Sequence, residues 1–457
     1  MIKFQTKTLV GGVMAVTALA LIGGATPAAA QATATEPGGA MTSIGNSLLA
    51  HGIYLRGDYI GEFAANPSGG IKQSDRYAGQ VDAGADFDLN TIAGIPGAAV
   101  HLTFSQRHGQ NLAAKDIGSS VSVQEVYGGG QTYRLSELSW DQALFNDKLE
   151  FLVGRIDVGS DFAASSIYCN FQTNSVCGNP SLFGQDNSLT YFPVPTWGGR
   201  FTVKPTPQYY IQSGAYEASA YQGLSTQHGF DFSTDKSTGV IIPFEVGYQT
   251  SFRTDAMPRH YRLGGFYDSA QYNDPYFDTT GRSQAVTGGS FQTHSGRTTL
   301  FALFDQMIWR PDPAKERGLI LFGGLTTGTS SDQVADYYLQ LGLLQRGTFE
   351  GRDADTVGLV VTDLKFSQRT ENFIIDSRRL AGGTGSPNAN MIMMEVNYGA
   401  QVTPWLRFVP NLQYIINPDN INEPTRKTNI PDAFVIGLKM AVSLPSLIGL
   451  PTRSYSH

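Results

Sequence analysis

The feature that most constrains this chain is a repeated alternation of apolar and polar side chains with a period of two residues. From residue 51 onward, short segments place apolar or small residues at every second position and polar residues between them. In residues 53–63, for example, Leu55 and Phe63 fall on one side, whereas Arg56 and Glu62 fall on the other. Because successive side chains of a β-strand point to opposite faces, the pattern predicts strands with two chemically different faces.

About sixteen such segments, each of roughly 8 to 14 residues, follow one another along the chain. Turn-forming clusters separate them, for instance Asn-Pro-Ser-Gly-Gly at residues 66–70 and Asn-Asp-Pro at residues 273–275. No helical spacing of useful length competes with the alternation. The sequence therefore predicts an all-β fold whose last good strand runs from Phe434 to Leu444.

A soluble sandwich and a membrane barrel both alternate, so the choice depends on what the polar face borders. A closed barrel of about sixteen strands is too wide for side chains to fill, and its lumen must hold water. The polar face then lines the lumen and the apolar face meets lipid. Charged residues are only 16% of the chain, against about 25% in ordinary soluble domains. We therefore predict a transmembrane antiparallel β-barrel of the outer-membrane porin type over residues 50–444.

The N-terminal residues have the form of an export signal. Residues 1–30 combine a basic start, an apolar core and small residues that suit cleavage after Ala30. A single membrane anchor is the alternative, but the apolar core is short of the ~20 residues that a spanning helix needs. We expect residues 31–49 to be an N-terminal periplasmic segment, and we expect the mature protein to lie in the bacterial outer membrane with lipid around its wall.

Charge and motif content exclude several classes of function. The chain has 32 Lys and Arg residues against 39 Asp and Glu residues, which argues against nucleic-acid binding because phosphate contacts need a concentrated basic surface. It contains no phosphate-binding loop, no His-Glu-x-x-His zinc motif and no Gly-x-Ser-x-Gly elbow. We predict no enzymatic activity, no cofactor and no metal. An outer-membrane barrel hydrolase, with Ser and His brought together by folding, and an adhesion barrel remain alternatives.

Two cysteines, Cys169 and Cys177, lie eight positions apart in a polar segment. In an exported protein, such a pair suggests a disulfide that pins an external or inward-folded loop. A metal site is the competing interpretation, but no His lies nearby to complete a set of ligands.

Charged residues on the predicted lumen faces are candidates for a solute path. Arg56 and Arg107 lie on separate early strands, and Asp58 and Glu62 share the face of Arg56. Arginine offers several fixed donors and carboxylates offer acceptors, a combination that suits sugar hydroxyls, which both donate and accept. The alternative is that these charges form salt bridges that only shape the wall.

Aromatic residues suggest two further roles. Trp197 and Tyr54 could stack on the C–H faces of a sugar ring, although an interfacial position is the favoured interpretation for Trp197. Membrane barrels carry aromatic girdles at both interfaces. We expect members of such girdles among Tyr209, Tyr210, Tyr216, Tyr221, Tyr261, Tyr267, Tyr272, Tyr337 and Tyr338.

Several motifs resemble the carbohydrate-selective porins of the OprB type. The resemblance spans most of residues 53–444 and is strongest before about residue 220 and from 395 to 440. The motifs are Arg56-Gly-Asp-Tyr, residues 63–70, the segment Tyr77-Ala-Gly-Gln-Val-Asp-Ala-Gly-Ala-Asp-Phe-Asp-Leu89, Gly94-Ile-Pro-Gly97, Leu135-Ser-Glu-Leu-Ser-Trp140, residues 149–155, Pro195-Thr-Trp-Gly-Gly-Arg200 and residues 410–418.

The resemblance implies a sixteen-stranded barrel that passes glucose and other mono- and small oligosaccharides by facilitated diffusion, with loops folded inward to form a narrow constriction that bears arginine. Arg56 and Arg107 are then the first candidates for constriction residues, and Trp197 is a weaker candidate. A general diffusion porin without sugar preference is the alternative within transport, and both a monomer and a homotrimer remain open. The C-terminal extension, residues 445–457, departs from the usual pattern, in which the last barrel strand ends the chain on an aromatic residue.

Overall fold

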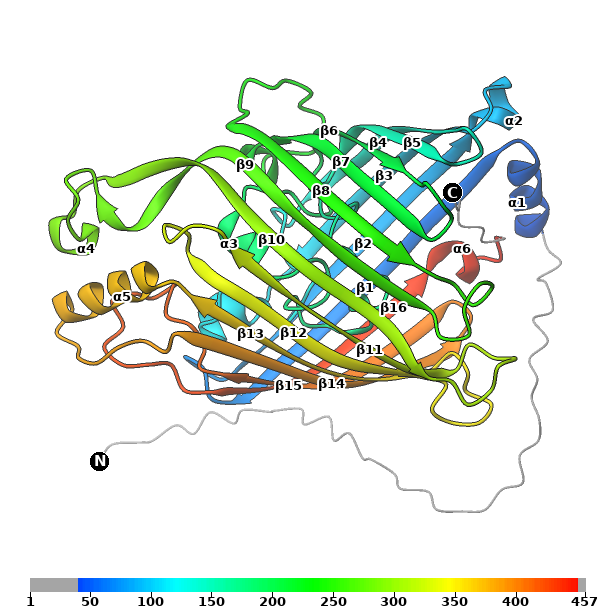
Figure 1. Cartoon of the computed structure of the whole chain (residues 1–457). Helices are drawn as coiled ribbons and strands as arrows, with labels where there is room; N and C mark the ends of the chain where they lie inside the picture. Colours follow the sequence, from blue (N-terminus) through cyan, green and yellow to red (C-terminus); the bar gives the residue numbers. More distant parts are fainter. Residues whose placement is uncertain (1–39, 451–457) are drawn as a thin grey trace, which may run out of the picture. The chain divides into compact units, whose positions relative to one another are not determined.

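The alternating segments fold into sixteen strands that close into one antiparallel barrel (Figure 1). The structure is a computed structural model and describes residues 40–450. The predicted fold class is confirmed. The strands are β1 (Ile53–Ser68), β2 (Ser74–Asp88), β3 (Ala98–Gly109), β4 (Tyr133–Leu144), β5 (Leu149–Ile156), β6 (Thr196–Val203), β7 (Tyr209–Ala218), β8 (Gly239–Gln249), β9 (Arg259–Asp278), β10 (Phe291–Trp309), β11 (Gly318–Gly328), β12 (Ala335–Arg346), β13 (Thr356–Phe366), β14 (Asn390–Thr403), β15 (Leu406–Ile416) and β16 (Ala433–Ser443).

Each strand pairs with its neighbours in sequence, and β1 pairs with β16 to close the wall, with Glu62 opposite Lys439. Within residues 40–450, closure leaves no unpaired strand edge, as a barrel in lipid requires. Connections at one end are short turns such as residues 145–148, whereas long loops such as 110–132 and 157–195 leave the other end. Outer-membrane barrels have short periplasmic turns and longer external loops, so we refer to these as the periplasmic and external ends.

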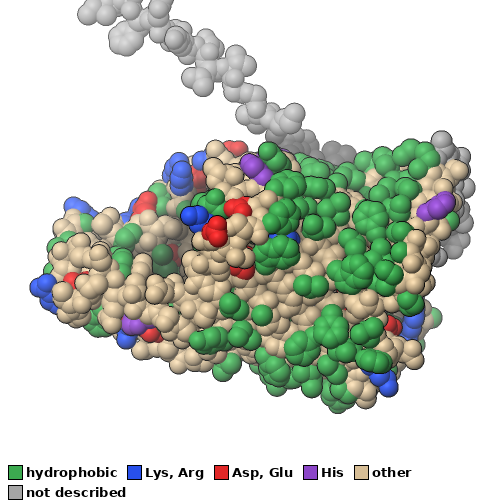
Figure 2. All heavy atoms as spheres, turned by 90° about the horizontal axis from the view of Figure 1, so that it is seen from above, with side chains coloured by type: hydrophobic (Ala, Val, Ile, Leu, Met, Phe, Trp, Pro, Cys, Tyr) green, Lys and Arg blue, Asp and Glu red, His purple; other side chains and the backbone are tan. Residues whose placement is uncertain are grey.

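Outside the barrel, alternating positions expose large apolar side chains. Leu263 on β9 and Leu341 on β12 are 58% and 55% exposed, and Figure 2 shows hydrophobic side chains over a broad area of one face. The alternation also corrects part of the predicted aromatic girdle. Tyr209 is 56% exposed, but its neighbour Tyr210 is 8% exposed because adjacent strand residues face opposite sides. Tyr216 and Tyr338 are likewise buried and do not belong to a girdle.

The lumen is partly filled by protein, and the inward-folded loops that the family resemblance implied are present. Loop 157–195 folds into the barrel and packs apolar side chains against inward-facing residues of the wall. The Phe183 ring lies 4.7 Å from that of Phe266 and 5.8 Å from that of Phe301, and the rings of Phe171 and Phe322 are 5.7 Å apart, all between centroids. These contacts bury both partners, so one side of the barrel interior is a packed core.

Helices occupy the two ends of the barrel, with α4 and α5 at the external end and α1, α2 and α6 at the other (Figure 1). Helix α5 was not predicted from the alternation; its N-cap is Ser367, whose side chain accepts a hydrogen bond from the Thr370 N–H. None of the described helices is long and apolar enough to cross a membrane. The helices are α1 (Ala40–Ala50), α2 (Leu89–Ala93), α3 (Leu182–Asp186), α4 (Gln284–Thr287), α5 (Gln368–Leu380) and α6 (Leu444–Leu447), with short turns of helix at Ala113–Ile117, Tyr168–Asn170 and Ala220–Gly223.

The predicted chain ends are only partly described. Helix α1 covers the end of the predicted N-terminal segment and one further residue, Ala50, and α6 begins one residue before the predicted C-terminal extension. The carbonyl of Gly449, just after α6, accepts a hydrogen bond from the Thr42 hydroxyl. The proposed signal peptide, residues 1–30, and residues 451–457 lie outside the described residues.

Candidate functional site

Buried carboxylates of the wall hold loop 157–195 inside the barrel. Glu395 on β14 accepts the backbone N–H groups of Gln172 and Thr173 at 3.0 and 2.8 Å. Glu245 on β8 accepts the N–H of Ala163 at 2.8 Å in the same way. A carboxylate that accepts backbone N–H groups satisfies donors that the inward fold would otherwise leave unpaired. The loop is therefore fixed to two distant parts of the wall.

Loop 110–132 is held by the same kind of contact. Glu62 on β1 accepts the N–H of Val126 at 3.1 Å, and Asp419 accepts the N–H of Ser120 at 2.7 Å. The two inward loops also bond to each other, since the Asn174 N–H donates to the carbonyl of Ser122 at 2.9 Å. Together the loops form an inner structure that narrows the lumen.

Within loop 157–195, Cys169 and Cys177 form a disulfide, with Cα atoms 4.3 Å apart. Lys439 on β16 donates from Nζ to the carbonyl of Phe171 at 3.2 Å, next to this bridge. The disulfide thus lies in the part of the loop that crosses to the β14–β16 wall.

Three cavities leave a path beside the inward loops, along the inner face of β1–β5. The outer cavity, about 450 Å³, shares Ser120, Tyr127 and Asn174 with the central cavity of about 670 Å³. The central cavity shares Asp157 and Phe192, among others, with the inner cavity of about 350 Å³. Because neighbouring cavities share lining residues, they adjoin one another in succession inside the barrel.

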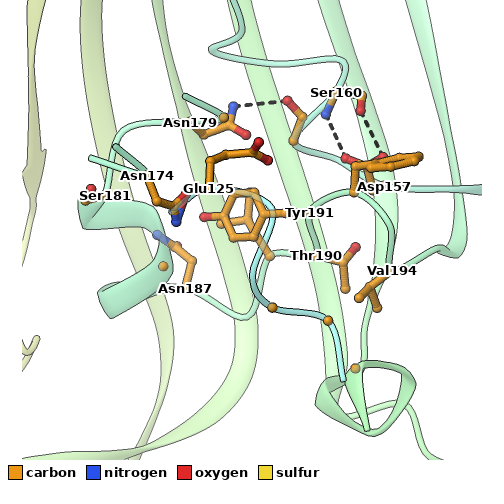
Figure 3. Close-up of a pocket in the computed structure, with 18 of the residues that line it drawn as sticks. Glu125, Asp157, Ser160, Asn174, Asn179, Ser181, Asn187, Thr190, Tyr191 and Val194 are labelled. Atoms are coloured by element: carbon orange, nitrogen blue, oxygen red, sulfur yellow. Dashed lines mark hydrogen bonds between the residues drawn. The ribbon is translucent and has the colours of Figure 1, made fainter. Parts of the chain in front are cut away.

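The central cavity is lined mainly by polar loop residues. Figure 3 shows Glu125, Asn174 and Tyr191 around it. Arg107 on β3 also lines it, donates from Nε to Gln80 Oε1 at 2.6 Å, and lies 3.5 Å from Glu125 between Nη2 and Oε1. The cavity thus combines fixed donors and acceptors, the groups that recognition of hydroxyls requires, and Arg107 itself is 5% exposed.

Asp157 stands where the central and inner cavities meet. It is the first residue after β5, is 6% exposed, and accepts hydrogen bonds from the N–H and hydroxyl of Ser160 at 2.8 and 2.9 Å (Figure 3). Burial raises the pKa of Asp157 to about 7, and the nearby Asp161 carboxylate acts in the same direction. The charge at this junction therefore changes near neutral pH.

The inner cavity surrounds Arg56. Its Nη2 atom lies 2.8 Å from Asp86 Oδ1 and 3.3 Å from Glu137 Oε2, and donates to the Thr103 hydroxyl at 3.1 Å. Asp58 is exposed and lines the same cavity. The structure thus places Arg56 and Asp58 in a cavity of the lumen, nearer the periplasmic end than Arg107.

The structure places two predicted path residues elsewhere. Glu62 faces the lumen, but loop 110–132 covers it completely, and it holds Val126 instead of facing a solute. Trp197 on β6 points outward, and its indole N–H donates to the carbonyl of Phe232 at 2.9 Å. Alternation sets the face of a side chain but not what covers that face.

Other lining residues were not singled out from the sequence. Asp82 and Glu137 follow the strand alternation and were detectable on that basis. Asp157, Asn174 and Tyr191 lie on loops that have no periodic pattern, so no sequence signal marks them.

Comparison with known proteins agrees with this architecture. Residues 72–444 match the family model described as carbohydrate-selective porin, OprB family. The chain belongs to this family. It is 33% identical over 408 residues to Porin B of Pseudomonas aeruginosa, covering 86% of this chain and 88% of that protein. It is 26% identical over 414 residues to the putative porin QuiX of Acinetobacter baylyi, covering 86% of this chain and 89% of that protein.

Among solved structures, the high-pH structure of Pseudomonas putida OprB superposes with a TM-score of 0.80 at 32% identity, covering 87% of this chain and 96% of that one. This chain is therefore an outer-membrane porin of the carbohydrate-selective OprB family. Its relatives are channels, which places its function in transport.

Proposed function

We propose that this porin mediates facilitated diffusion of glucose and other small neutral sugars, and that Arg107 and Arg56 bind them in succession. The observation that carries the proposal is the succession of three adjoining cavities inside the barrel, the central one of which has hydrogen-bonding side chains in its lining. The central volume of about 670 Å³ falls within the usual range of roughly 300 to 1,000 Å³ for small-molecule sites.

Passage of a sugar needs contacts that replace some of its hydration without retaining it. In the central cavity, Arg107 supplies donors while Glu125 and the Asn174 amide supply acceptors. In the inner cavity, Arg56 likewise supplies hydrogen-bond donors and Asp58 supplies acceptors. A chain of such weak sites lets a hydroxylated solute move between partners of similar strength.

Liposome swelling with glucose, an amino acid of similar size and a salt tests the proposal. We expect glucose to enter faster than the amino acid. Replacing Arg107 by Ala removes a charge-assisted contact of about 1.5–3 kcal/mol, and we expect shorter sugar blocks and a larger open current in single-channel recordings. Arg310→Ala is the matched control, because Arg310 lies at the periplasmic end and donates to the backbone carbonyls of Ala256 and Pro313.

Equal swelling rates for glucose and the amino acid would instead identify a general diffusion porin. Unchanged sugar blocking in both Arg107→Ala and Arg56→Ala would show that other residues bind the sugar.

A further inference from the structure

Helix α6 lies on the outer surface of the barrel, near its periplasmic end. Arg56 and Asp58 line the inner cavity, so Gly57, which stands between them on β1, faces outward. A Cβ atom at Gly57 would lie 3.5 Å from Leu444 Cδ1 and 3.6 Å from Leu444 Cβ. Because α6 begins at Leu444, the helix covers part of the outer face of β1.

The contact between α6 and β1 lies within the height of the wall. Gly57 is four residues inside β1, which begins at Ile53, and this corresponds to roughly 13 Å along the strand. Leu55, two positions before Gly57 on the same face, is 37% exposed and belongs to the apolar outer wall. The lipid-facing surface of β1 therefore reaches the edge of α6.

Helix α1 is joined to α6 at the same place. The Thr42 hydroxyl of α1 donates to the carbonyl of Gly449, just after α6, at 3.0 Å. Gly45 in the middle of α1 is buried, and α1 also contacts β1. Figure 1 shows both helices at this end of the barrel. They form one unit beside the wall, which we call the α1–α6 pair.

The α1–α6 pair exposes large apolar side chains. Met41 and Ile44 on α1 are 41% and 51% exposed, and Leu447 and Ile448 at the end of α6 are 45% and 50% exposed. On α1, the spacing of three residues places Met41 and Ile44 on one side of the helix. The apolar character of the outer wall thus continues onto the pair.

The remaining surface of α1 is polar and uncharged. Ser43, Asn46 and Ser47 are exposed, and residues 40–50 and 444–450 include no Asp, Glu, Lys or Arg. A cluster of exposed apolar side chains marks an interaction surface. A helix at a membrane surface places its apolar side among the acyl chains and its polar side among the headgroups. The two sides of α1 have the chemistry that this position requires.

We propose that the α1–α6 pair lies in the periplasmic leaflet of the outer membrane, with its four exposed apolar side chains in contact with phospholipid. The continuity of these side chains with the lipid-facing wall favours lipid over a protein partner. Because α1 precedes β1 and α6 follows β16, the contact holds both ends of the barrel chain at the membrane surface. The inference is independent of the solute that the channel passes.

Spin labels on single introduced cysteines test the proposal. The two native cysteines are joined in a disulfide and the chain has no others, so a label attaches selectively to Ile44→Cys or Leu447→Cys. The full-length variants are placed in phosphatidylethanolamine–phosphatidylglycerol vesicles. Power-saturation spectroscopy then compares the access of oxygen, which concentrates among acyl chains, with that of a water-soluble nickel chelate. We expect both labels to favour oxygen, at a depth of about 5–10 Å.

Two further variants provide the references. Ser43→Cys is the matched control, because Ser43 adjoins Ile44 on α1 and is exposed on the polar side, and we expect its label to meet the nickel chelate several-fold more readily. Leu263→Cys, on the outer wall at β9, gives the value for a lipid-facing position.

Each outcome decides the proposal. Equal access of the nickel chelate to the labels at positions 44 and 43 would place the α1 face in water and refute lipid contact. Poor access of both probes to position 44 would show that protein, such as a second copy of the chain, covers the face, and would refute it equally. Leu447→Cys reports on the same pair from the other helix, so the test stands even if one variant does not insert.

Discussion

Lys439 and Glu62 form a buried ion pair across the β1–β16 seam, with Nζ and Oε1 3.4 Å apart. Each partner also holds one inward loop. Glu62 accepts the N–H of Val126 from loop 110–132, and Lys439 donates to the carbonyl of Phe171 from loop 157–195. The seam that closes the barrel is thus one of the places where both loops are bonded to the wall.

Replacing Lys439 by Met should destabilise the barrel strongly. It leaves the Glu62 carboxylate, which is fully buried, without its cation, and removing one partner of a buried pair costs about 3–5 kcal/mol. Thermal unfolding in detergent, followed by circular dichroism, measures the effect. Lys365→Met is the control, because Lys365 forms only partly exposed ion pairs, which contribute about 1 kcal/mol or less. Equal losses in both variants would contradict a special role for the seam.

Replacing Glu395 by Ala should widen the channel. The change removes the acceptor of the Gln172 and Thr173 N–H groups, so the middle of loop 157–195 loses a wall contact. We expect a larger and noisier single-channel current. Asp363→Ala serves as the control, since Asp363 accepts a hydrogen bond from Asn390 on the neighbouring strand β14 and contacts neither loop by that bond. A wild-type current in Glu395→Ala would show that the other anchors suffice.

Ion selectivity should depend on pH through Asp157. Its pKa is raised to about 7 by burial, with the Asp161 and Glu137 carboxylates acting in the same direction, so the side chain is neutral well below that pH and negative above it. Cation preference should therefore increase between about pH 5.5 and pH 8.5. Reversal potentials measure this increase, and Asp157→Asn should remove most of it. An identical pH profile in the variant would assign the titration to another group.

The same pKa affects stability with a definite sign. The folded state of Asp157 binds its proton more tightly than the unfolded state, whose pKa is near the ordinary value of 3.8. Its contribution to the free energy of unfolding is therefore fully present at low pH and is lost as pH rises from about 4 through about 7. Against Asp157→Asn, wild-type stability should fall across this window, which thermal unfolding at several pH values can measure.

The two cysteines should be found linked in protein isolated from the envelope. Mass spectrometry without reductant should detect one cross-linked peptide pair, whereas two free thiols would refute the bridge. With a separation of eight residues, the double variant Cys169→Ser/Cys177→Ser should lose about 2 kcal/mol, chiefly through greater freedom of the unfolded chain.

Alternation along the strands was enough to predict the barrel, its number of strands and the lumen-facing positions of Arg56, Asp58 and Arg107. The pattern is local, because a strand residue faces one side or the other according to its place in the pleat. The same alternation places Glu395 and Val396 on opposite faces of β14. It could not distinguish Tyr209 from Tyr210 as a girdle residue without the exact strand register.

What covers each lumen position was decided only by the tertiary structure. Arg56 and Glu62 lie on the same face of β1, six positions apart, yet Arg56 lines a cavity while Glu62 is sealed beneath Val126. Loops 110–132 and 157–195 carry no periodic signal, and their anchors join residues as distant as Gln172 and Glu395, 223 positions apart. The sequence by itself therefore determined the barrel wall, because the alternation of apolar and polar residues is a local property of each strand. The cavities inside the barrel depended on the folded loops, because long-range contacts between loop and wall decide which inward-facing side chains are covered and which line a cavity.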